Sequence, residues 1–190
     1  TGATFTGNDV VSKNEDFGIR TTDLVSALTG NVILKANNDI TIDSAIDASG
    51  NNNAGNLELQ AGRSIDINAN ITVEGSFTAI ANEASAKAGT RDAGDATFNS
   101  NGFTINTADS TASTHDISIS YQVGPGEGFP TGAMVIGTLN AGSSGTITIN
   151  STSSETVSVD AVTNASALTL TQSNGATFEG AVNAGTITLS

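Results

Sequence analysis

Apolar and polar residues alternate with period two over short runs, and the runs themselves repeat after 25 residues. Residues 30–54 read GNVILKANNDITIDSAIDASGNNNA, and residues 55–79 read GNLELQAGRSIDINANITVEGSFTA. The matched apolar positions are Leu34 with Leu59, Ala36 with Ala61, Ile40 with Ile65, Ile42 with Ile67, and Ile46 with Ile71. Repetition at this period predicts a solenoid, in which each repeat buries its apolar side against its neighbours.

The alternation also predicts which side chains point inward. In the first unit we expect Val32, Leu34 and Ala36 to face the interior, with Ile33 and Lys35 outside. The second unit places Leu57, Leu59 and Ala61 inside. Two more short strands per unit follow, at 40–42 and 46 in the first unit and at 65–67 and 71 in the second. Three strands per unit predict an all-β fold, a parallel β-helix (β-solenoid) with coils of about 20–25 residues. Because crossovers between parallel strands are strongly biased to the right hand, we expect a right-handed β-helix.

A shorter period continues the pattern in the second half. Residues 147–149, 168–170 and 187–189 carry Ile/Leu-Thr-Ile/Leu triplets, 21 and 19 residues apart. The unit Gly-Ala-Thr-Phe occurs at 2–5 and 175–178, and Asp-Ala-Thr-Phe occurs at 95–98. We therefore expect one solenoid domain over 1–190, built from like units at both ends and without a capping element. Such a chain is expected to be a segment of a longer array.

Two stretches interrupt the rhythm and are predicted to be loops. Residues 81–94 are rich in alanine, and residues 124–132 contain both prolines and four glycines. Loops on a rigid scaffold commonly carry binding residues. The candidate contact residues in them are Lys87, Arg91, Glu127 and Phe129.

Charge limits the partners. The net charge is −13, and all six Lys and Arg residues precede residue 92. Phosphate and anionic lipid recognition depend on Lys and Arg, so nucleic acid and anionic membrane surfaces are excluded as expected partners. No apolar run reaches the ~18 residues of a membrane span, so no membrane insertion is expected. The chain has no cysteine.

The sequence predicts no catalytic residues, no cofactor and no enzyme activity. Asp92 and Asp95 form the nearest approach to a paired carboxylate of the kind that glycosidases use. Oxygen ligands for calcium are weakly suggested by Asp47, Asp92 and Asp95, and neither of their loops has the spacing of an EF-hand. The lone His115 cannot build a metal cluster or a triad by itself, and we interpret it as a structural residue of a turn.

Threonine pairs flank the strand centres of the second half, at 146/148, 169/171 and 186/188. We expect each pair to project outward and the three pairs to stack. Some ice-binding solenoids present such arrays, whereas the simpler interpretation is the preference of threonine for exposed strand positions.

The paired GN-[VL]-x-L-x-A…I-x-I…I units and the Gly-Ala-Thr-Phe units resemble coils of large bacterial surface proteins of the filamentous-haemagglutinin type. The resemblance covers 30–79 and 140–190. It implies a right-handed β-helix at the bacterial cell surface or outside the cell, with attachment or matrix building as the role. The expected partners are a host-cell, matrix or glycan surface, or copies of the chain end to end. A self-assembling filament or sheath subunit and a polysaccharide-active β-helix enzyme are the alternatives.

Overall fold

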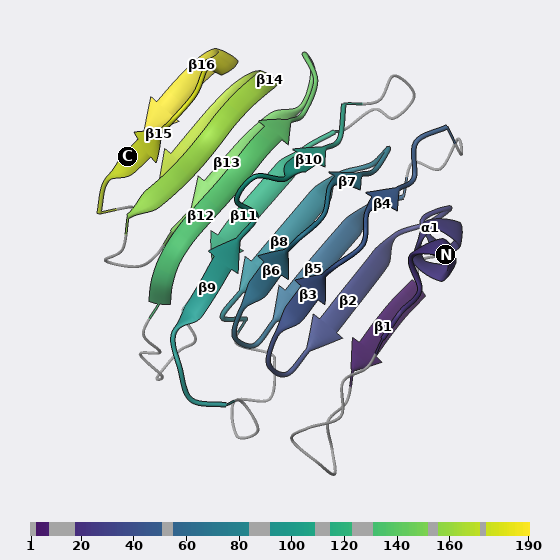
Figure 1. The fold of residues 1–190 in the computed structure, drawn as a ribbon. Helices are drawn as coiled ribbons and strands as arrows, with labels where there is room; N and C mark the ends of the chain where they lie inside the picture. Colours follow the sequence, from purple (N-terminus) through teal and green to yellow (C-terminus); the bar gives the residue numbers. More distant parts are fainter. Residues whose placement is uncertain are drawn as a thin grey trace.

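The computed structural model describes residues 3–7, 18–50, 55–83, 92–108, 115–122, 131–151, 156–171 and 174–190. Over these residues the protein is all-β, with one short helix. Sixteen strands join in one sheet that curves until it is nearly closed, and its strands pair in parallel (Figure 1).

The elements follow one another in chain order with short strands in the first half and longer ones in the second. They are β1 (Ala3–Gly7), α1 (Thr21–Ala27), β2 (Val32–Ala36), β3 (Ile40–Ile42), β4 (Ile46–Asp47), β5 (Leu57–Ala61), β6 (Ile65–Ile67), β7 (Ile71–Thr72), β8 (Phe77–Ala81), β9 (Ala96–Asn99), β10 (Thr104–Asn106), β11 (Ile117–Tyr121), β12 (Thr131–Asn140), β13 (Thr146–Asn150), β14 (Val157–Thr171), β15 (Ala176–Phe178) and β16 (Val182–Leu189).

Strand pairing divides the sheet into three walls. Wall A contains β1, β2, β5, β8, β11, β13 and the last parts of β14 and β16. Wall B contains β3, β6, β9, the first parts of β12 and β14, and β15. Wall C contains β4, β7, β10, the end of β12, the middle of β14 and the start of β16. The chain passes through A, B and C in turn, and we call one such passage a coil.

The 25-residue repeat is the register of the first two complete coils. Leu34 lies opposite Leu59 in wall A, and Ile40 lies opposite Ile65 in wall B. Wall C follows the same offset, because Ile46 lies opposite Ile71. The predicted three-strand unit is therefore confirmed in all three walls.

The second half keeps the stacking with longer strands. Ile147 lies opposite Leu168, and Leu168 lies opposite Ile187, as the shorter period predicts. In place of separate short strands, β14 runs for 15 residues through walls B, C and A. Its corners fall at small or polar residues rather than at loops, which is why the coil is shorter here than at the first repeat.

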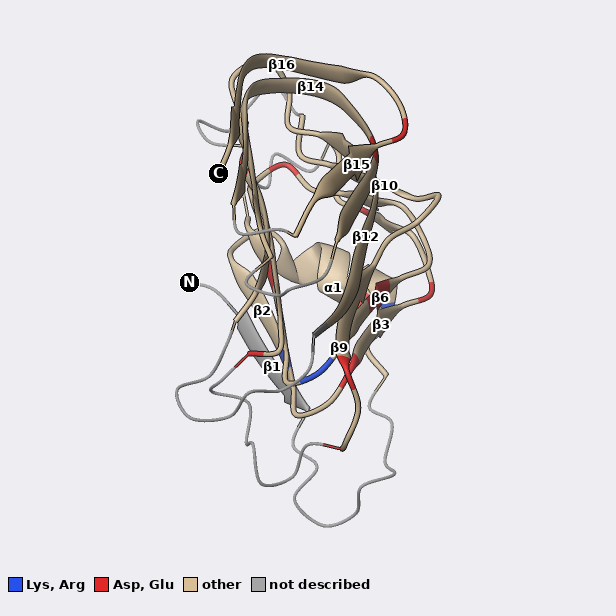
Figure 2. Ribbon diagram, turned by 90° about the vertical axis from the view of Figure 1, so that its left-hand side faces the viewer, with Lys and Arg blue, Asp and Glu red and all other residues tan. Residues whose placement is uncertain are grey.

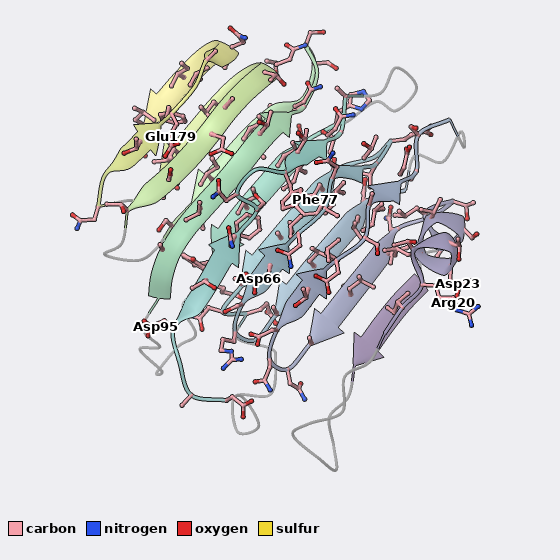
Figure 3. The ribbon with its side chains drawn as sticks, viewed as in Figure 1. Arg20, Asp23, Asp66, Phe77, Asp95 and Glu179 are labelled. Carbon is pink, nitrogen blue, oxygen red and sulfur yellow. The ribbon has the colours of Figure 1, made fainter. Side chains whose placement is uncertain are left out.

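The inward positions form one continuous core. Val32 and Leu34 are buried in wall A, as predicted. Lys35, the outward residue that follows Leu34, is half-buried. Ala36, predicted inside, is half-buried as well. Phe77 lies in the middle of wall A and is fully buried (Figure 3). Burying each large aliphatic side chain contributes about 1.5–3 kcal/mol, so the stacked columns are the main source of stability.

Side-chain acceptors hold the corner that precedes wall A, and they repeat from coil to coil. The backbone N–H of Asn56 donates to Asn31 Oδ1 (3.1 Å), and that of Ser76 donates to Asn56 Oδ1 (2.8 Å). The N–H of Asp116 donates to Ser76 Oγ (3.2 Å), and that of Thr146 donates to Asp116 Oδ1 (2.8 Å). This ladder satisfies backbone donors that the strands leave unpaired at the corner.

The corner between walls B and C requires a glycine at one position. A Cβ at Gly137 would lie 2.0 Å from the carbonyl oxygen of Phe103 and 2.3 Å from that of Ser100. The Gly137 N–H also donates to Ser100 Oγ at 3.0 Å. Only a residue without Cβ lets the two coils approach this closely.

Helix α1 closes the first end of the core. Leu24 and Leu28 are four residues apart and lie on one helix face, and both are buried in the core cluster. Thr22 and Asp23 are exposed on the opposite side. The helix lies beside β4 and between the walls (Figures 1 and 2).

The two terminal Ala-Thr-Phe units are not equivalent. Residues 3–7 form β1 in wall A, opposite β2. Residues 96–99 and 176–178 form β9 and β15, and both lie in wall B. The same local sequence therefore occupies wall A at residues 3–7 and wall B at residues 176–178.

Candidate interaction surfaces

The outer face of wall A carries a column of hydroxyl side chains, which we call the hydroxyl column. Register pairs Thr78 with Ser118, Ser118 with Thr148, Thr148 with Thr169, and Thr169 with Thr188. The threonines at 148 and 188 are exposed, and the other three members are half-buried. Since parallel strands lie about 4.8 Å apart, the column is a regular row of hydroxyl and methyl groups.

The predicted stacking of the three threonine pairs is confirmed in part. Thr148, Thr169 and Thr188 stack, and Thr146 and Thr186 share a second column with Ala167 between them. The remaining pair member, Thr171, lies opposite Asn150 instead. The middle pair is thus shifted by two residues relative to its neighbours.

Charge is absent from this part of wall A. Outward positions in β11, β13 and the wall A parts of β14 and β16 are Ser, Thr, Asn or Ala. Charged outward residues of wall A occur earlier, at Lys35 and Glu58. The acidic positions of the described chain lie mostly at the corners and in wall B (Figure 2). The hydroxyl column is therefore a neutral strip on an acidic protein.

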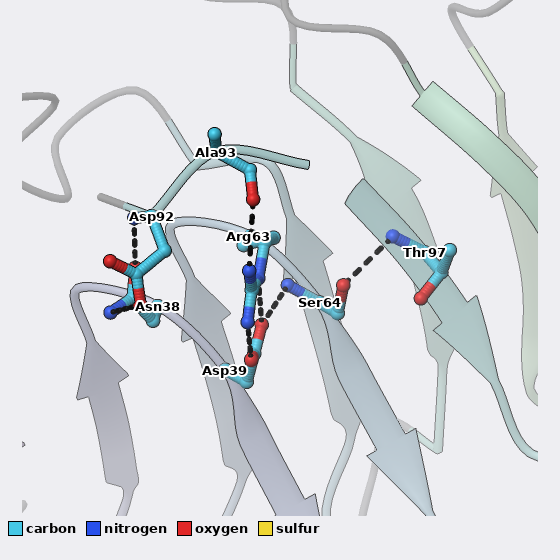
Figure 4. A network of polar contacts seen from close by, with 7 residues as sticks. All are labelled: Asn38, Asp39, Arg63, Ser64, Asp92, Ala93 and Thr97. Carbon is cyan, nitrogen blue, oxygen red and sulfur yellow. Dashed lines mark hydrogen bonds and ion pairs between the residues drawn. The ribbon is translucent and has the colours of Figure 1, made fainter. Parts of the chain in front are cut away.

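A polar network occupies the corner between walls A and B (Figure 4). Arg63 binds Asp39 with two N–H groups, and the distance from Arg63 Nε to Asp39 Oδ1 is 2.8 Å. A third Arg63 N–H donates to the carbonyl oxygen of Ala93 at 3.3 Å. The hydrogen bond with Asp39 raises the pKa of Arg63 further above its ordinary value. Because both side chains are partly exposed, the pair is worth at most about 1 kcal/mol.

The same network fixes the end of the predicted loop 81–94. Asp92 N–H donates to Asn38 Oδ1 (2.7 Å), and Asn38 Nδ2 donates to Asp92 Oδ2 (3.3 Å). Ser64 N–H donates to Asp39 Oδ1 (3.0 Å), and Thr97 N–H donates to Ser64 Oγ (3.1 Å). These bonds connect three successive coils, so their role here is to hold the corner together.

Asp66 lies on wall B close to this network (Figure 3). Burial raises the pKa of its carboxyl, and the negative charges of Asp39 and Asp43 raise it as well, while Arg63 opposes them. Asn68 Nδ2 donates to Asp43 Oδ1 at 2.9 Å, which connects Asp43 to the next coil.

The calcium candidates lie in two segments: Asp47 ends β4, and Asp92 and Asp95 precede β9. Asp47 Oδ1 accepts hydrogen bonds from the N–H (3.0 Å) and hydroxyl (2.6 Å) of Ser49, and this bonding lowers the pKa of Asp47. Asp92 binds Asn38, and Asp95 is exposed. Within the described part of the chain, no group of three or more His, Cys, Asp or Glu side chains is arranged to hold a metal.

The four contact candidates Lys87, Arg91, Glu127 and Phe129 lie outside the described residues. The loop boundaries are corrected at both stretches. Ala81 is the last residue of β8 rather than a loop residue, and residues 131–132 already belong to β12.

His115 lies at the corner before β11 and is buried, with 5% of its surface exposed. Its carbonyl oxygen accepts a hydrogen bond from the Thr107 hydroxyl, and its Nδ1 atom has no hydrogen-bond partner. This position agrees with a structural residue of the corner.

The chain has no match among protein-family models, curated proteins or solved structures. Among the described residues, no helix has the length and apolar character needed to cross a bilayer.

Proposed function

We propose that the chain is a segment of a right-handed parallel β-helix of the filamentous-haemagglutinin type, with an adhesive and structural role at the bacterial cell surface. The observation that supports this proposal most is the hydroxyl column. It combines a rigid backbone ladder with a neutral, regularly spaced set of hydrogen-bonding groups.

The strand order favours the β-helix. Each coil visits walls A, B and C and then pairs in parallel with the preceding coil. Parallel crossovers within a sheet are strongly biased to the right hand. Such a stack transmits force along its axis and serves as a spacer, because each coil is bonded to the next on three sides.

The partner that suits the hydroxyl column is a neutral polysaccharide surface. A hydroxyl group donates one hydrogen bond and accepts two, so Thr and Ser can pair with sugar hydroxyls in either direction. A net charge of −13 repels anionic surfaces but leaves a neutral one accessible. Each contact is weak, and affinity comes from several contacts made at once along a periodic partner.

A binding experiment with a matched pair of variants tests the proposal. The chain is incubated with insoluble neutral β-glucan and chitin, and the bound fraction is measured over a range of concentrations. Thr148→Glu with Thr169→Glu places two charges on the hydroxyl column. Thr41→Glu with Thr72→Glu adds the same charge to outward positions of walls B and C.

We expect the wall A variant to bind at least ten-fold more weakly than the unchanged chain, and the control variant to bind within two-fold of it. Equal binding by the two variants, or no binding by the unchanged chain, would contradict the proposal. Sugar release is measured in the same samples. Release that Asp92→Ala with Asp95→Ala abolishes would favour the polysaccharide-active enzyme instead.

A further inference from the structure

An asparagine followed by glycine is a side-chain amide prone to spontaneous loss of ammonia, and the chain contains this pair twice. The preceding residue is the same in both places: the sequences are Ser-Asn-Gly at 100–102 and Ser-Asn-Gly at 173–175. Glycine has no Cβ, so its backbone nitrogen can approach the asparagine side chain closely. Because the two tripeptides have the same intrinsic chemistry, a difference in their reaction rates reports their structural surroundings.

The reaction is deamidation through a cyclic imide. The backbone nitrogen of the glycine attacks Cγ of the asparagine, so that the N–Cγ bond forms and the Cγ–Nδ2 bond breaks. The amide nitrogen leaves as ammonia and takes the proton of the glycine N–H. Water then opens the ring at one of its two carbonyl groups and gives aspartate or isoaspartate. The structure can control the first step, because the glycine N–H must give up its proton there.

The first of these tripeptides forms the turn between walls B and C. Phe103 N–H donates to the carbonyl oxygen of Ser100 at 3.0 Å, and Gly102 has a φ of +76°, as the third residue of a type II turn requires. Asn101 and Gly102 are both exposed. Asn101 N–H donates to Asn99 Oδ1 at 3.1 Å. Water therefore reaches the reactive amide, while the backbone around it is held by hydrogen bonds.

The Gly102 N–H is held by a carboxylate from a distant coil. It donates to Asp160 Oδ2 at 3.1 Å, and the two residues are 58 positions apart in the sequence. Asp160 belongs to β14, which is separated from β9 by β12 in wall B (Figure 1). At this corner β12 contributes Gly137, which has no side chain to separate the carboxylate from the turn. Asp160 thus reaches across one coil to the nitrogen that would react.

This hydrogen bond opposes the first step of deamidation. Its proton is the one that must leave, and a hydrogen bond to an ionised acceptor is stronger than one between neutral groups. Negative charge that develops on the glycine nitrogen would also be repelled by the carboxylate beside it. Reaction therefore requires the turn to open locally first, which the hydrogen bonds of the corner resist.

We propose that Asn101 is a site of spontaneous deamidation and that Asp160 is a positioning residue that slows this modification by holding the Gly102 N–H. The carboxylate acts through the glycine nitrogen and does not itself react. This inference goes beyond the adhesive role and does not depend on it.

Modification at Asn101 would affect the contact between coils. Isoaspartate adds one backbone bond to a turn whose carbonyl and hydroxyl groups bind the next coil. The Phe103 carbonyl oxygen accepts a hydrogen bond from Thr138 N–H at 2.9 Å. Ser100 Oγ accepts one from Gly137 N–H at 3.0 Å. Protection of this amide by Asp160 therefore preserves the corner between walls B and C.

Mass spectrometry of the full chain tests the proposal. The chain is incubated at pH 8 for several weeks, and deamidation is followed in the two chymotryptic peptides that contain Asn101 and Asn174. Asp160→Ala removes the acceptor, whereas Asp160→Asn keeps an acceptor oxygen without the charge. Asp23→Ala removes an exposed carboxylate of α1 and is the matched control. Far-UV circular dichroism reports whether each variant keeps the fold, and a sample in urea gives the rates in the unfolded chain.

We expect Asn101 of the unchanged chain to react at least ten-fold more slowly when folded than in urea. Asp160→Ala should raise the folded rate at Asn101 at least five-fold and leave the rate at Asn174 within two-fold. Asp160→Asn should give a rate between those of the unchanged chain and Asp160→Ala, and Asp23→Ala should change neither site.

Equal folded and unfolded rates at Asn101 in the unchanged chain would overturn the proposal without any variant. An unchanged rate in Asp160→Ala would overturn it as well. The same rise at Asn101 and Asn174 would assign the effect to general loosening of the fold and would also overturn it. None of these outcomes depends on polysaccharide binding, so the two proposals fail separately.

Discussion

Replacing isoleucine by alanine should cost a different free energy of unfolding at different levels of the stack. Ile147 and Ile187 occupy the same inward column of wall A, with Leu168 between them. Ile147 is fully buried, and Ile187 is 50% exposed. The same chemical change therefore samples a fully buried and a half-exposed position of one column.

The magnitudes follow from burial. Ile→Ala removes three carbon atoms, worth about 2.4 kcal/mol when fully buried at ~0.8 kcal/mol per methylene. At Ile147 the cavity between two coils adds to this, so we expect a loss of about 2–5 kcal/mol. At Ile187 about half of the transfer term remains and no closed cavity forms, so we expect a loss of about 1 kcal/mol.

Urea unfolding followed by far-UV circular dichroism measures both values. Thr148→Ala is the control at an outward position next to Ile147, and we expect it to change stability by less than about 0.5 kcal/mol. The denaturant slopes must agree among variants, because repeat arrays can lose two-state behaviour. Equal losses at Ile147 and Ile187 would refute the link between burial and stability on which this prediction rests.

Two further predictions concern the corners and wall B. Gly137→Ala should destabilise the chain by about 1–3 kcal/mol or more in urea unfolding, because the added Cβ meets the Phe103 backbone. Gly18→Ala is the control and should be neutral, because its added Cβ has nothing within 4 Å. Similar losses of stability in the two variants would show that the close approach at Gly137 is absent. Asp66→Asn should raise the free energy of unfolding at pH 7, because the raised pKa makes the folded carboxylate unfavourable. This gain in stability should vanish at pH 3, below the ordinary aspartate pKa of 3.8, because Asp66 is then protonated in both the folded and the unfolded state. An equal gain at pH 7 and pH 3 would exclude the raised pKa as its cause.

The sequence predicted the strands and their register in the walls well, because its periodicity reflects both the stacking of coils and the alternation of inward and outward side chains. Leu34 and Leu59 lie opposite each other at the predicted offset, and their outward neighbours were predicted as well. Helix α1 was not predicted, because the only helical signal in its sequence is the four-residue spacing of Leu24 and Leu28 within a short polar segment. A helix of seven residues gives too few turns for a clear helical period.

The corner network could not be predicted from the repeat. In the repeat Asp39 aligns with Ser64, but its ion-pair partner is Arg63, one residue earlier. The partner of Asn38 is Asp92, which lies 54 residues away. Such contacts depend on how each corner bends, which alternation does not encode. The hydroxyl column was predicted only in part: Thr171 follows the triplet 168–170, whereas Thr146 and Thr186 precede their triplets, so Thr171 lies opposite Asn150.

The central claim is that wall A is a stack of in-register coils, so distance along it depends on the number of strands crossed and not on sequence separation. Ile33, Thr78, Thr148 and Thr188 occupy one outward column. The pairs Thr78/Thr188 and Ile33/Thr148 are each four strand steps apart, and Ile33/Thr188 is six steps apart. At about 4.8 Å per step, these separations are ~19 Å, ~19 Å and ~29 Å.

Nitroxide labels on cysteines introduced at these positions, in a chain that has no cysteine of its own, allow pulsed electron paramagnetic resonance to measure the three distances. We predict equal distances for Thr78/Thr188 and Ile33/Thr148, and a distance about 10 Å longer for Ile33/Thr188. A difference between the first two pairs larger than one strand spacing, or no lengthening in the third, would contradict the stacked architecture.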